Sequence, residues 1–202
     1  MKNYFVLFLL YLMINNLSYS QSDTTAPITP RNVQAFGYER HIDLVWWDNE
    51  EPDLAGYKIY RKINNQWYYW TTVPKEKSYL MLSNLGMNYT LTLKVSAIDL
   101  SGNESALSDS VVATTHIMTD EEFLDMTQRA TFRYFWDYAH PVSGLARERL
   151  GSGETVTIGG SGFGIMALLV GAERGFKSRE LVSKRMLKIL NFLNNQADRF
   201  HG

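Results

Sequence analysis

The chain has 202 residues, of which 20 are Lys or Arg and 21 are Asp or Glu, so its formal net charge at pH 7 is −1. This balance argues against a nucleic-acid-binding protein and against a polybasic membrane-binding segment. The chain contains no cysteine, which excludes disulfide bonds and a lipid-modified cysteine. Each domain must therefore be stabilised by its own hydrophobic core.

The first 20 residues have the features of a secretory signal. Lys2 precedes an apolar run over residues 5–14, and the small residues Ser18 and Ser20 have the spacing of a cleavage site. A membrane anchor is the less favoured interpretation, because this run has only about half of the ~20 residues that cross a bilayer. We therefore expect a signal peptide over residues 1–20, a secreted or periplasmic protein, and no membrane span in the mature chain.

Residues 26–116 have the alternation that is typical of short β-strands. Ile42, Leu44 and Trp46 alternate with their neighbours, and the same period of two recurs in GYKIYRK (56–62) and YTLTLKVSAID (89–99). Turn-forming residues separate these runs. The pattern predicts a small all-β sandwich.

The residues of this segment resemble a fibronectin type III domain. A proline-rich entry leads to a strand that ends at Trp46, followed by LAGYKIYR and LGMNYTLTLKVSAIDLSGNES. The resemblance implies that Trp46 lies between the two sheets and that Tyr89 is a corner tyrosine whose hydroxyl bonds to the upstream backbone. The four consecutive rings from Trp67 to Trp70 form either a platform for a sugar or a surface that covers a neighbouring domain, and we favour the second interpretation.

After the sandwich, the hydrophobic period becomes that of α-helices. Thr119 and Glu122 have the spacing of a capping box, at the start of a helix that should end before Pro141. A later helix should start at Ser178, with an apolar stripe on one side and basic residues on its solvated side. The sequence therefore predicts an all-β module followed by an all-α module.

The stretch TIGGSGFGIMALLVGAERGF (157–176) places four glycines within residues 159–164. Gly162, Gly164 and Ala167 match the looser form of a dinucleotide-binding fingerprint, but no preceding strand of adequate length and no βαβ pattern accompany them. We instead expect a closely packed loop, with Ser161 as the cap of a helix over residues 162–174. That helix is apolar on all sides, so we expect neighbours to enclose it, and we expect no cofactor.

The helical segment carries a second family resemblance. FRYFWDYAHPVSGLARER (132–149), TIGGSGFGIMALLVGAERGFKSRE (157–180) and ADRFHG (197–202) resemble the opening of the bacterial glycoamylase-like domain, a group that includes glycoside hydrolase family 144. The resemblance covers residues 118–202 and implies an (α/α)6 toroid that hydrolyses glucan, of the endo-β-1,2-glucanase type. Three helices cannot close such a double ring. We therefore expect the chain to be the N-terminal part of the enzyme and to be inactive alone.

Hydrolysis of a glycosidic bond ordinarily needs two carboxyl groups, and we expect the acid and the base beyond residue 202. Within the chain, Glu148 is the candidate for a carboxylate at a cleft rim, because it lies in a loop beside Arg149. The candidates for binding a glucan are Trp136, Arg149, Phe163 and His201. For each candidate, ordinary packing or solvation is the alternative, and no metal site is expected. The competing hypothesis for the whole chain is a non-catalytic carbohydrate-binding or adhesion module with a helical extension.

Overall fold

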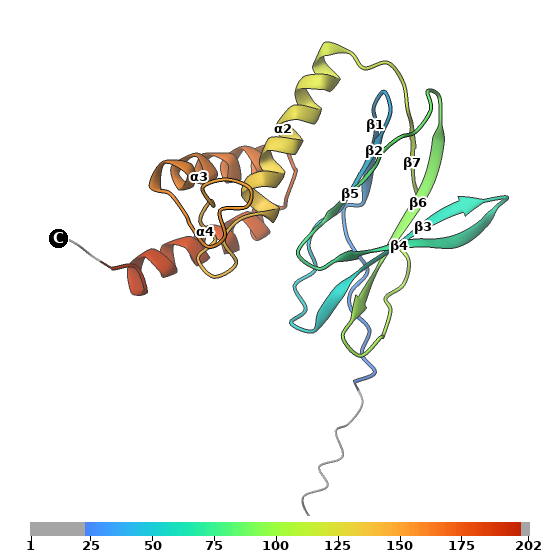
Figure 1. Ribbon diagram of the computed structural model, residues 1–202. Helices are drawn as coiled ribbons and strands as arrows, with labels where there is room; N and C mark the ends of the chain where they lie inside the picture. Colours follow the sequence, from blue (N-terminus) through green and yellow to red (C-terminus); the bar gives the residue numbers. More distant parts are fainter. Residues whose placement is uncertain (1–22, 199–202) are drawn as a thin grey trace, which may run out of the picture.

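The computed structural model describes residues 23–198 and shows a β-sandwich followed by three helices (Figure 1). This arrangement confirms the predicted fold class, an all-β module before an all-α module. The predicted signal peptide and His201 lie outside the described residues. In the part of the chain that is described, no helix is long and apolar enough to cross a membrane.

The sandwich consists of two antiparallel sheets with the strand orders β1-β2-β5 and β4-β3-β6-β7. The strands are β1 (Gln34–Gly37), β2 (Ile42–Val45), β3 (Leu54–Ile63), β4 (Gln66–Pro74), β5 (Tyr79–Leu82), β6 (Thr90–Asp99) and β7 (Val111–Thr114). The chain crosses between the sheets at the β2–β3, β4–β5 and β5–β6 connections, as in a fibronectin type III-like sandwich.

The core between the sheets is formed by the side chains that the alternation predicts. Ile42, Leu44, Tyr57 and Ile59 are 0% exposed, and Trp46 is 1% exposed. The rings of Trp46 and Tyr57 meet edge to face with their centroids 5.1 Å apart. Aromatic pairs favour this geometry, because the positive edge of one ring faces the negative face of the other. The predicted position of Trp46 in the core is thus confirmed.

The predicted role of Tyr89 is wrong. Its side chain is 46% exposed, and its hydroxyl has no hydrogen-bond partner within residues 23–198. The connection between β5 and β6 is held instead by Thr115. Its hydroxyl accepts a hydrogen bond from the Tyr89 amide at 2.8 Å and donates to the Gly86 carbonyl at 2.6 Å. Thr115 is fully buried, so a short side chain satisfies both backbone groups without the reach of a tyrosine.

The aromatic run from Trp67 to Trp70 lies in β4, at an edge of the four-stranded sheet. Trp70 packs against the core, whereas Tyr68 and Tyr69 are 46% and 55% exposed. The helices contact the other sheet, so these rings do not cover the helical part. That prediction is therefore wrong for the described chain.

The helices are α2 (Asp120–Asp137), α3 (Ile158–Glu173) and α4 (Arg179–Asn195). The predicted capping box of α2 is confirmed: the Glu122 amide donates to the Thr119 hydroxyl at 3.2 Å, and the Thr119 amide donates to the Glu122 carboxylate at 2.8 Å. Ser178 caps α4 as expected, accepting from the Leu181 amide at 3.1 Å. These caps satisfy amides that have no partner inside the helix.

Helix α3 begins four residues earlier than the sequence predicts. Its cap is Thr157, which accepts from the Gly160 amide at 3.2 Å, and Ser161 is a buried residue inside the helix. The glycines therefore belong to the helix rather than to a preceding loop. At Gly171 an added Cβ would lie 2.2 Å from a ring carbon of Phe132, so the missing side chain lets α3 approach α2 closely.

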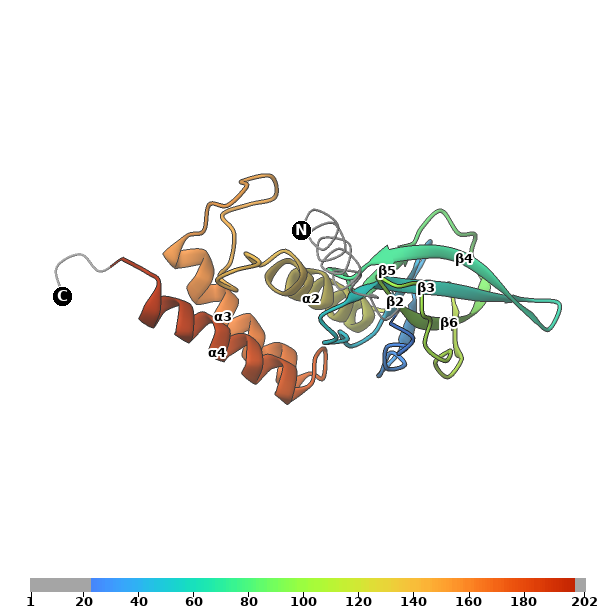
Figure 2. The same cartoon turned by 90° about the horizontal axis from the view of Figure 1, so that it is seen from below.

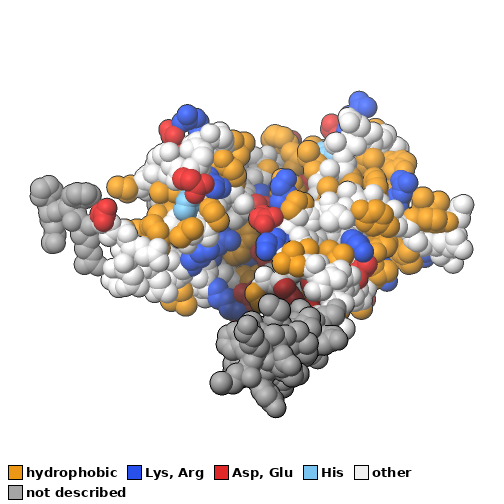
Figure 3. Space-filling model, turned by 60° about the horizontal axis from the view of Figure 1, so that its bottom comes forward, with side chains coloured by type: hydrophobic (Ala, Val, Ile, Leu, Met, Phe, Trp, Pro, Cys, Tyr) orange, Lys and Arg blue, Asp and Glu red, His pale blue; other side chains and the backbone are white. Residues whose placement is uncertain are grey.

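Helix α2 lies beside the three-stranded sheet and joins the two parts of the molecule (Figure 1). Arg133 donates to the buried Asp43 carboxylate at 3.0 Å, and the guanidinium of Arg129 lies 4.1 Å from the centroid of the Phe36 ring. The view from below shows α3 and α4 extending from α2, away from the sandwich (Figure 2). The space-filling view shows acidic and basic side chains together between the two parts, and hydrophobic side chains on the surface of both (Figure 3).

Candidate functional site

A groove of about 570 Å³ opens between α2, the α2–α3 loop and the start of α3. Its lining consists of Tyr134, Phe135, Arg147, Glu148, Arg149, Leu150, Gly160 and Phe163. Three of the predicted site residues, Glu148, Arg149 and Phe163, are therefore brought together, although Phe163 lies 14 and 15 positions after the other two in the sequence.

Two tyrosines at the C-terminal end of α2 hold the α2–α3 loop, which carries Glu148 and Arg149. The Tyr134 hydroxyl donates to the Arg147 carbonyl at 2.7 Å, and the Tyr138 hydroxyl accepts from the Gly151 amide at 2.8 Å. Arg147 also forms an antiparallel bridge with Val156, which closes the loop on itself. Loop residues that are held by backbone hydrogen bonds present their side chains in a defined direction.

A network of charged groups holds the base of the same loop. His140 pairs with the Glu154 carboxylate at 2.7 Å, and Arg147 reaches the same carboxylate at 3.3 Å. The hydrogen bond from His140, followed by that from Arg147, holds the pKa of Glu154 below its ordinary value even though burial acts in the opposite direction. Ser143 completes a serine–histidine–carboxylate series with a contact of 3.2 Å to His140. Ser143 is only 1% exposed, so this serine cannot attack a substrate and the series is structural.

The rim of the groove combines a charged pair with an exposed ring. Arg149 donates to the Glu148 carboxylate, and these side chains are 69% and 43% exposed. The Phe163 ring is 73% exposed. A flat ring beside a guanidinium and a carboxylate can stack on the apolar face of a sugar while hydrogen-bonding its hydroxyls. Of the described residues that line the groove, Glu148 is the single carboxylate, so the groove by itself lacks the pair that hydrolysis needs.

Trp136 does not belong to this groove, which corrects its assignment as a sugar-binding residue. Its side chain is 5% exposed, and its indole N–H donates to the Asp48 carboxylate of the sandwich at 2.7 Å. The guanidinium of Arg185 lies 4.3 Å from the ring centroid. Because the sandwich and the helices enclose the ring, it stabilises their interface instead of facing a sugar.

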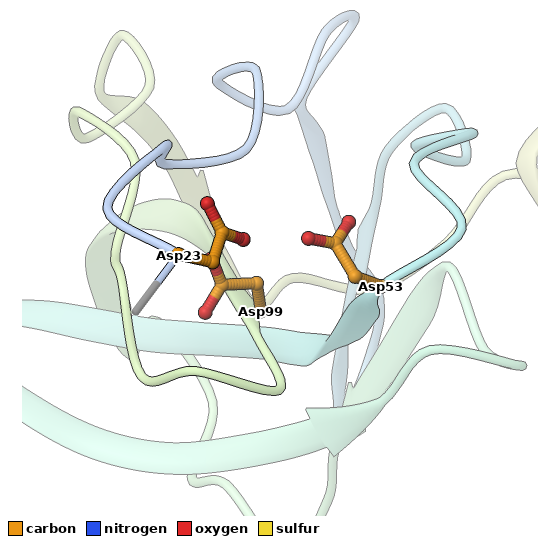
Figure 4. A group of neighbouring side chains, drawn as sticks. All are labelled: Asp23, Asp53 and Asp99. Carbon is orange, nitrogen blue, oxygen red and sulfur yellow. The ribbon is translucent and has the colours of Figure 1, made fainter. Parts of the chain in front are cut away.

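The sequence patterns did not single out a group of three carboxylates at one end of the sandwich. Oxygen atoms of Asp23, Asp53 and Asp99 lie within 4.8 Å of one another (Figure 4). Burial favours the neutral acid at Asp99, but hydrogen bonds from Asn103 and Ser101 hold its pKa below the ordinary value. The carboxylate of Asp99 is thus already used in ordering the turn that follows β6.

Comparisons with known proteins relate most of the chain to one kind of enzyme. Over 185 residues it is 44% identical to the exo β-1,2-glucooligosaccharide sophorohydrolase (non-reducing end) of Parabacteroides distasonis, covering 91% of this chain and 25% of the relative. The crystal structure of a β-1,2-glucanase from Parabacteroides distasonis matches with a TM-score of 0.62 and 40% identity, covering 91% of this chain and 26% of that one. The chain therefore spans about a quarter of the length of these relatives.

Other comparisons concern the sandwich or the chain as a whole. The crystal structure of chicken CNTN1 FN1–FN3 domains matches with a TM-score of 0.39 and 20% identity, covering 46% of this chain and 33% of that one. No family model matches the chain. The predicted resemblance of the helical segment is confirmed by the Parabacteroides relatives: over nine-tenths of its length, this chain is similar to a protein that is described as a β-1,2-glucan hydrolase.

Proposed function

We propose that this chain is part of an exported glycoside hydrolase that acts on β-1,2-glucan. The observation that carries the proposal is the 44% identity to the Parabacteroides sophorohydrolase, which extends over both the sandwich and the helices. A match of this extent covers both parts of the molecule, and not only a common module. The glucan is the partner we propose.

The groove beside α3 is the proposed site of contact with the glucan. Phe163 supplies an exposed ring, and Arg149 of the same groove supplies hydrogen-bond donors. Glu148 neutralises Arg149 and can accept hydrogen bonds from sugar hydroxyls. Binding groups of this kind position a glucan chain without taking part in bond cleavage.

We propose that the catalytic acid and base lie outside these 202 residues. Two observations support this: the groove is lined by one carboxylate, and the matching relative is about four times as long as the matched segment. The outer side of α3 beyond the groove is also unusually apolar for a surface, since Met166 and Leu169 are 61% and 54% exposed. Such a side is suited to packing against further helices.

A chimaera tests the proposal. The matching segment of the Parabacteroides enzyme is replaced by this chain, and hydrolysis of β-1,2-glucooligosaccharides is measured for the chimaera and for its Phe163→Ala, Arg149→Ala and Glu148→Gln variants. We expect an active chimaera in which each variant raises KM about tenfold, equivalent to about 1.4 kcal/mol, while kcat stays within a few-fold. The Tyr68→Ala variant, at an exposed ring of the sandwich, is the control and should change neither constant.

Two outcomes would oppose this proposal in different ways. If the chimaera folds but hydrolyses no glucan, the proposed function is wrong, and a non-catalytic module becomes the better hypothesis. If Glu148→Gln lowers kcat by about a thousandfold at unchanged KM, Glu148 is itself catalytic and the acid and base do not both lie elsewhere.

A further inference from the structure

The interface between the sandwich and the helices contains a buried cation that pairs with one carboxylate and lies near a second. Lys177, in the loop between α3 and α4, is only 5% exposed. Its ammonium group donates to the Asp48 carboxylate at 3.0 Å, to the Ser78 hydroxyl at 2.5 Å and to the Trp46 carbonyl at 3.4 Å. All three acceptors belong to the sandwich, so this lysine of the helical part is fully coordinated only when the two parts are docked.

The second carboxylate, Asp137, is poorly compensated. It is the last residue of α2, and its contact with the interface is a hydrogen bond of 3.5 Å from the Ser78 hydroxyl. Lys177 pairs directly with Asp48 and reaches Asp137 only through Ser78. Among the described carboxylates, Lys177 therefore pairs directly with Asp48 alone, and Asp137 loses solvation without gaining a direct ion pair.

The charged groups that face Asp137 come from every element around it. Lys177 from the α3–α4 loop, Arg133 from α2 and Arg185 from α4 favour its ionised form, whereas Asp48 from the β2–β3 loop opposes it. Burial is the largest effect and, with Asp48, raises the pKa of Asp137 to about 6. At Asp48 burial also favours the neutral acid, but Lys177 and its hydrogen bond outweigh it and lower the pKa.

A small cavity of about 30 Å³ adjoins these groups and is lined by Ser78, Asp137 and Lys177 among others. This volume accommodates about one water molecule, which is too little to hydrate an ionised carboxylate fully. Asp137 is partly exposed, so its ionised form keeps part of its hydration, but its burial still favours the neutral acid.

We infer that this interface is a pH-responsive latch, in which Asp137 takes up a proton when the sandwich and the helices dock, so that docking weakens as the pH rises from about 5 to 8. The inference does not depend on the proposed glucan hydrolysis. The consequence for the candidate site is direct, because Asp137 immediately precedes Tyr138, whose hydroxyl fastens the loop of the groove.

The sign of the effect follows from the two protonation states. Asp137 binds its proton more tightly in the docked state, because its pKa rises from the ordinary 3.8 to about 6. Docking is therefore favoured by the bound proton at low pH, and this advantage is lost as the pH rises through about 6. With these two pKa values, the docking equilibrium changes by roughly tenfold between pH 5 and pH 8. Asp48, whose pKa is lowered, acts in the opposite sense only at more acidic pH.

The test uses fluorescence energy transfer across the interface of the full chain. Because the chain has no cysteine, Ser101→Cys on the sandwich and Ser183→Cys on α4 provide two unique, exposed labelling positions. The urea concentration at which energy transfer falls to half is measured at pH 5 and pH 8. The urea range used stays below the concentration that unfolds the sandwich itself. We expect a lower midpoint at pH 8 for the native interface, and the same midpoint at both pH values for Asp137→Asn, which mimics the protonated acid.

Two further variants complete the test. Asp109→Asn, at an exposed acid of the sandwich, should retain the pH dependence of the native interface. Lys177→Met should lower the midpoint at both pH values, because Asp48 loses its buried partner. The inference is overturned if the native midpoint is equal at pH 5 and pH 8, if Asp137→Asn retains the pH dependence, or if Lys177→Met leaves the midpoint unchanged.

Discussion

Two neighbouring leucines of α3 should respond very differently to truncation. Leu168 is 2% exposed and packs in the core of the helical part, whereas Leu169 is 54% exposed. Replacing a buried leucine by alanine removes its burial and leaves a cavity, at a cost of about 2–5 kcal/mol. Replacing a half-exposed leucine costs less than about 1 kcal/mol, since neighbours cover little of it and alanine favours the helix.

The assay is chemical and thermal unfolding of the Leu168→Ala and Leu169→Ala variants, followed by circular dichroism. For Leu168→Ala, a loss of about 3 kcal/mol lowers the melting temperature by roughly 6–12 °C if the chain unfolds as one unit. For Leu169→Ala the shift should be at most about a third of that. Equal losses in this chain would show that α3 is enclosed on both sides, and would refute the assignment of its outer side as a docking surface.

The same pair also tests the proposed function in the chimaera. If further helices pack on the outer side of α3 there, Leu169→Ala should destabilise the chimaera by about as much as Leu168→Ala does. A Leu169→Ala cost that stays small in the chimaera would mean that this side of α3 remains open to solvent.

Three further predictions concern the sandwich, the first helix and the loop. Gly37→Ala should destabilise the protein by at least about 3 kcal/mol, because the added Cβ would lie 2.0 Å from the Thr114 carbonyl oxygen, while Gly86→Ala, with nothing within 4 Å of its Cβ, is the control in the same melts. Thr119→Ala should cost about 1 kcal/mol through loss of the helix cap, and a full-strength cap signal in the amide chemical shifts of the variant would contradict this. Tyr134→Phe should loosen the α2–α3 loop by removing its 2.7 Å hydrogen bond, so proteolytic cleavage within the loop should accelerate several-fold; unchanged cleavage would mean that this bond does not order the loop.

Sequence patterns predicted the sandwich well because its strands obey a strict period of two. The alternation placed Leu44 and Tyr57 in the core, and both are fully buried. The capping box at Thr119 was equally predictable, since it depends on residues that are close in the chain. These elements are determined by local rules that the fold does not override.

For helix α3, local sequence patterns predicted neither the buried side nor the first residue correctly. It is apolar on all sides, so periodicity cannot distinguish the buried Leu168 from the exposed Leu169. The glycine cluster suggested a loop capped by Ser161, whereas all four glycines lie within the helix and only Gly164 lies against α2, at Phe135. The helix starts at the Thr157 cap, a local signal that the glycine cluster after it obscured.

The candidate site was partly predictable for the same reason. Glu148 and Arg149 stood out as loop charges, and the fold brings Phe163 to the same groove. Trp136 was misassigned because helical spacing cannot tell whether a ring meets a sugar or another domain. The role of Lys177 was missed, since a lysine is rarely buried and its acceptors are about 100 or more residues earlier in the chain.

Hydrolysis by the chimaera that carries this chain in the Parabacteroides enzyme is the most direct test of the proposed function. Release of product is measured from β-1,2-glucan, with β-1,3- and β-1,4-linked glucans as parallel substrates. We expect cleavage of the β-1,2-linked substrate alone. A stably folded chimaera that cleaves none of the three, or that cleaves the other linkages equally well, would contradict the assignment of this chain to a β-1,2-glucan hydrolase.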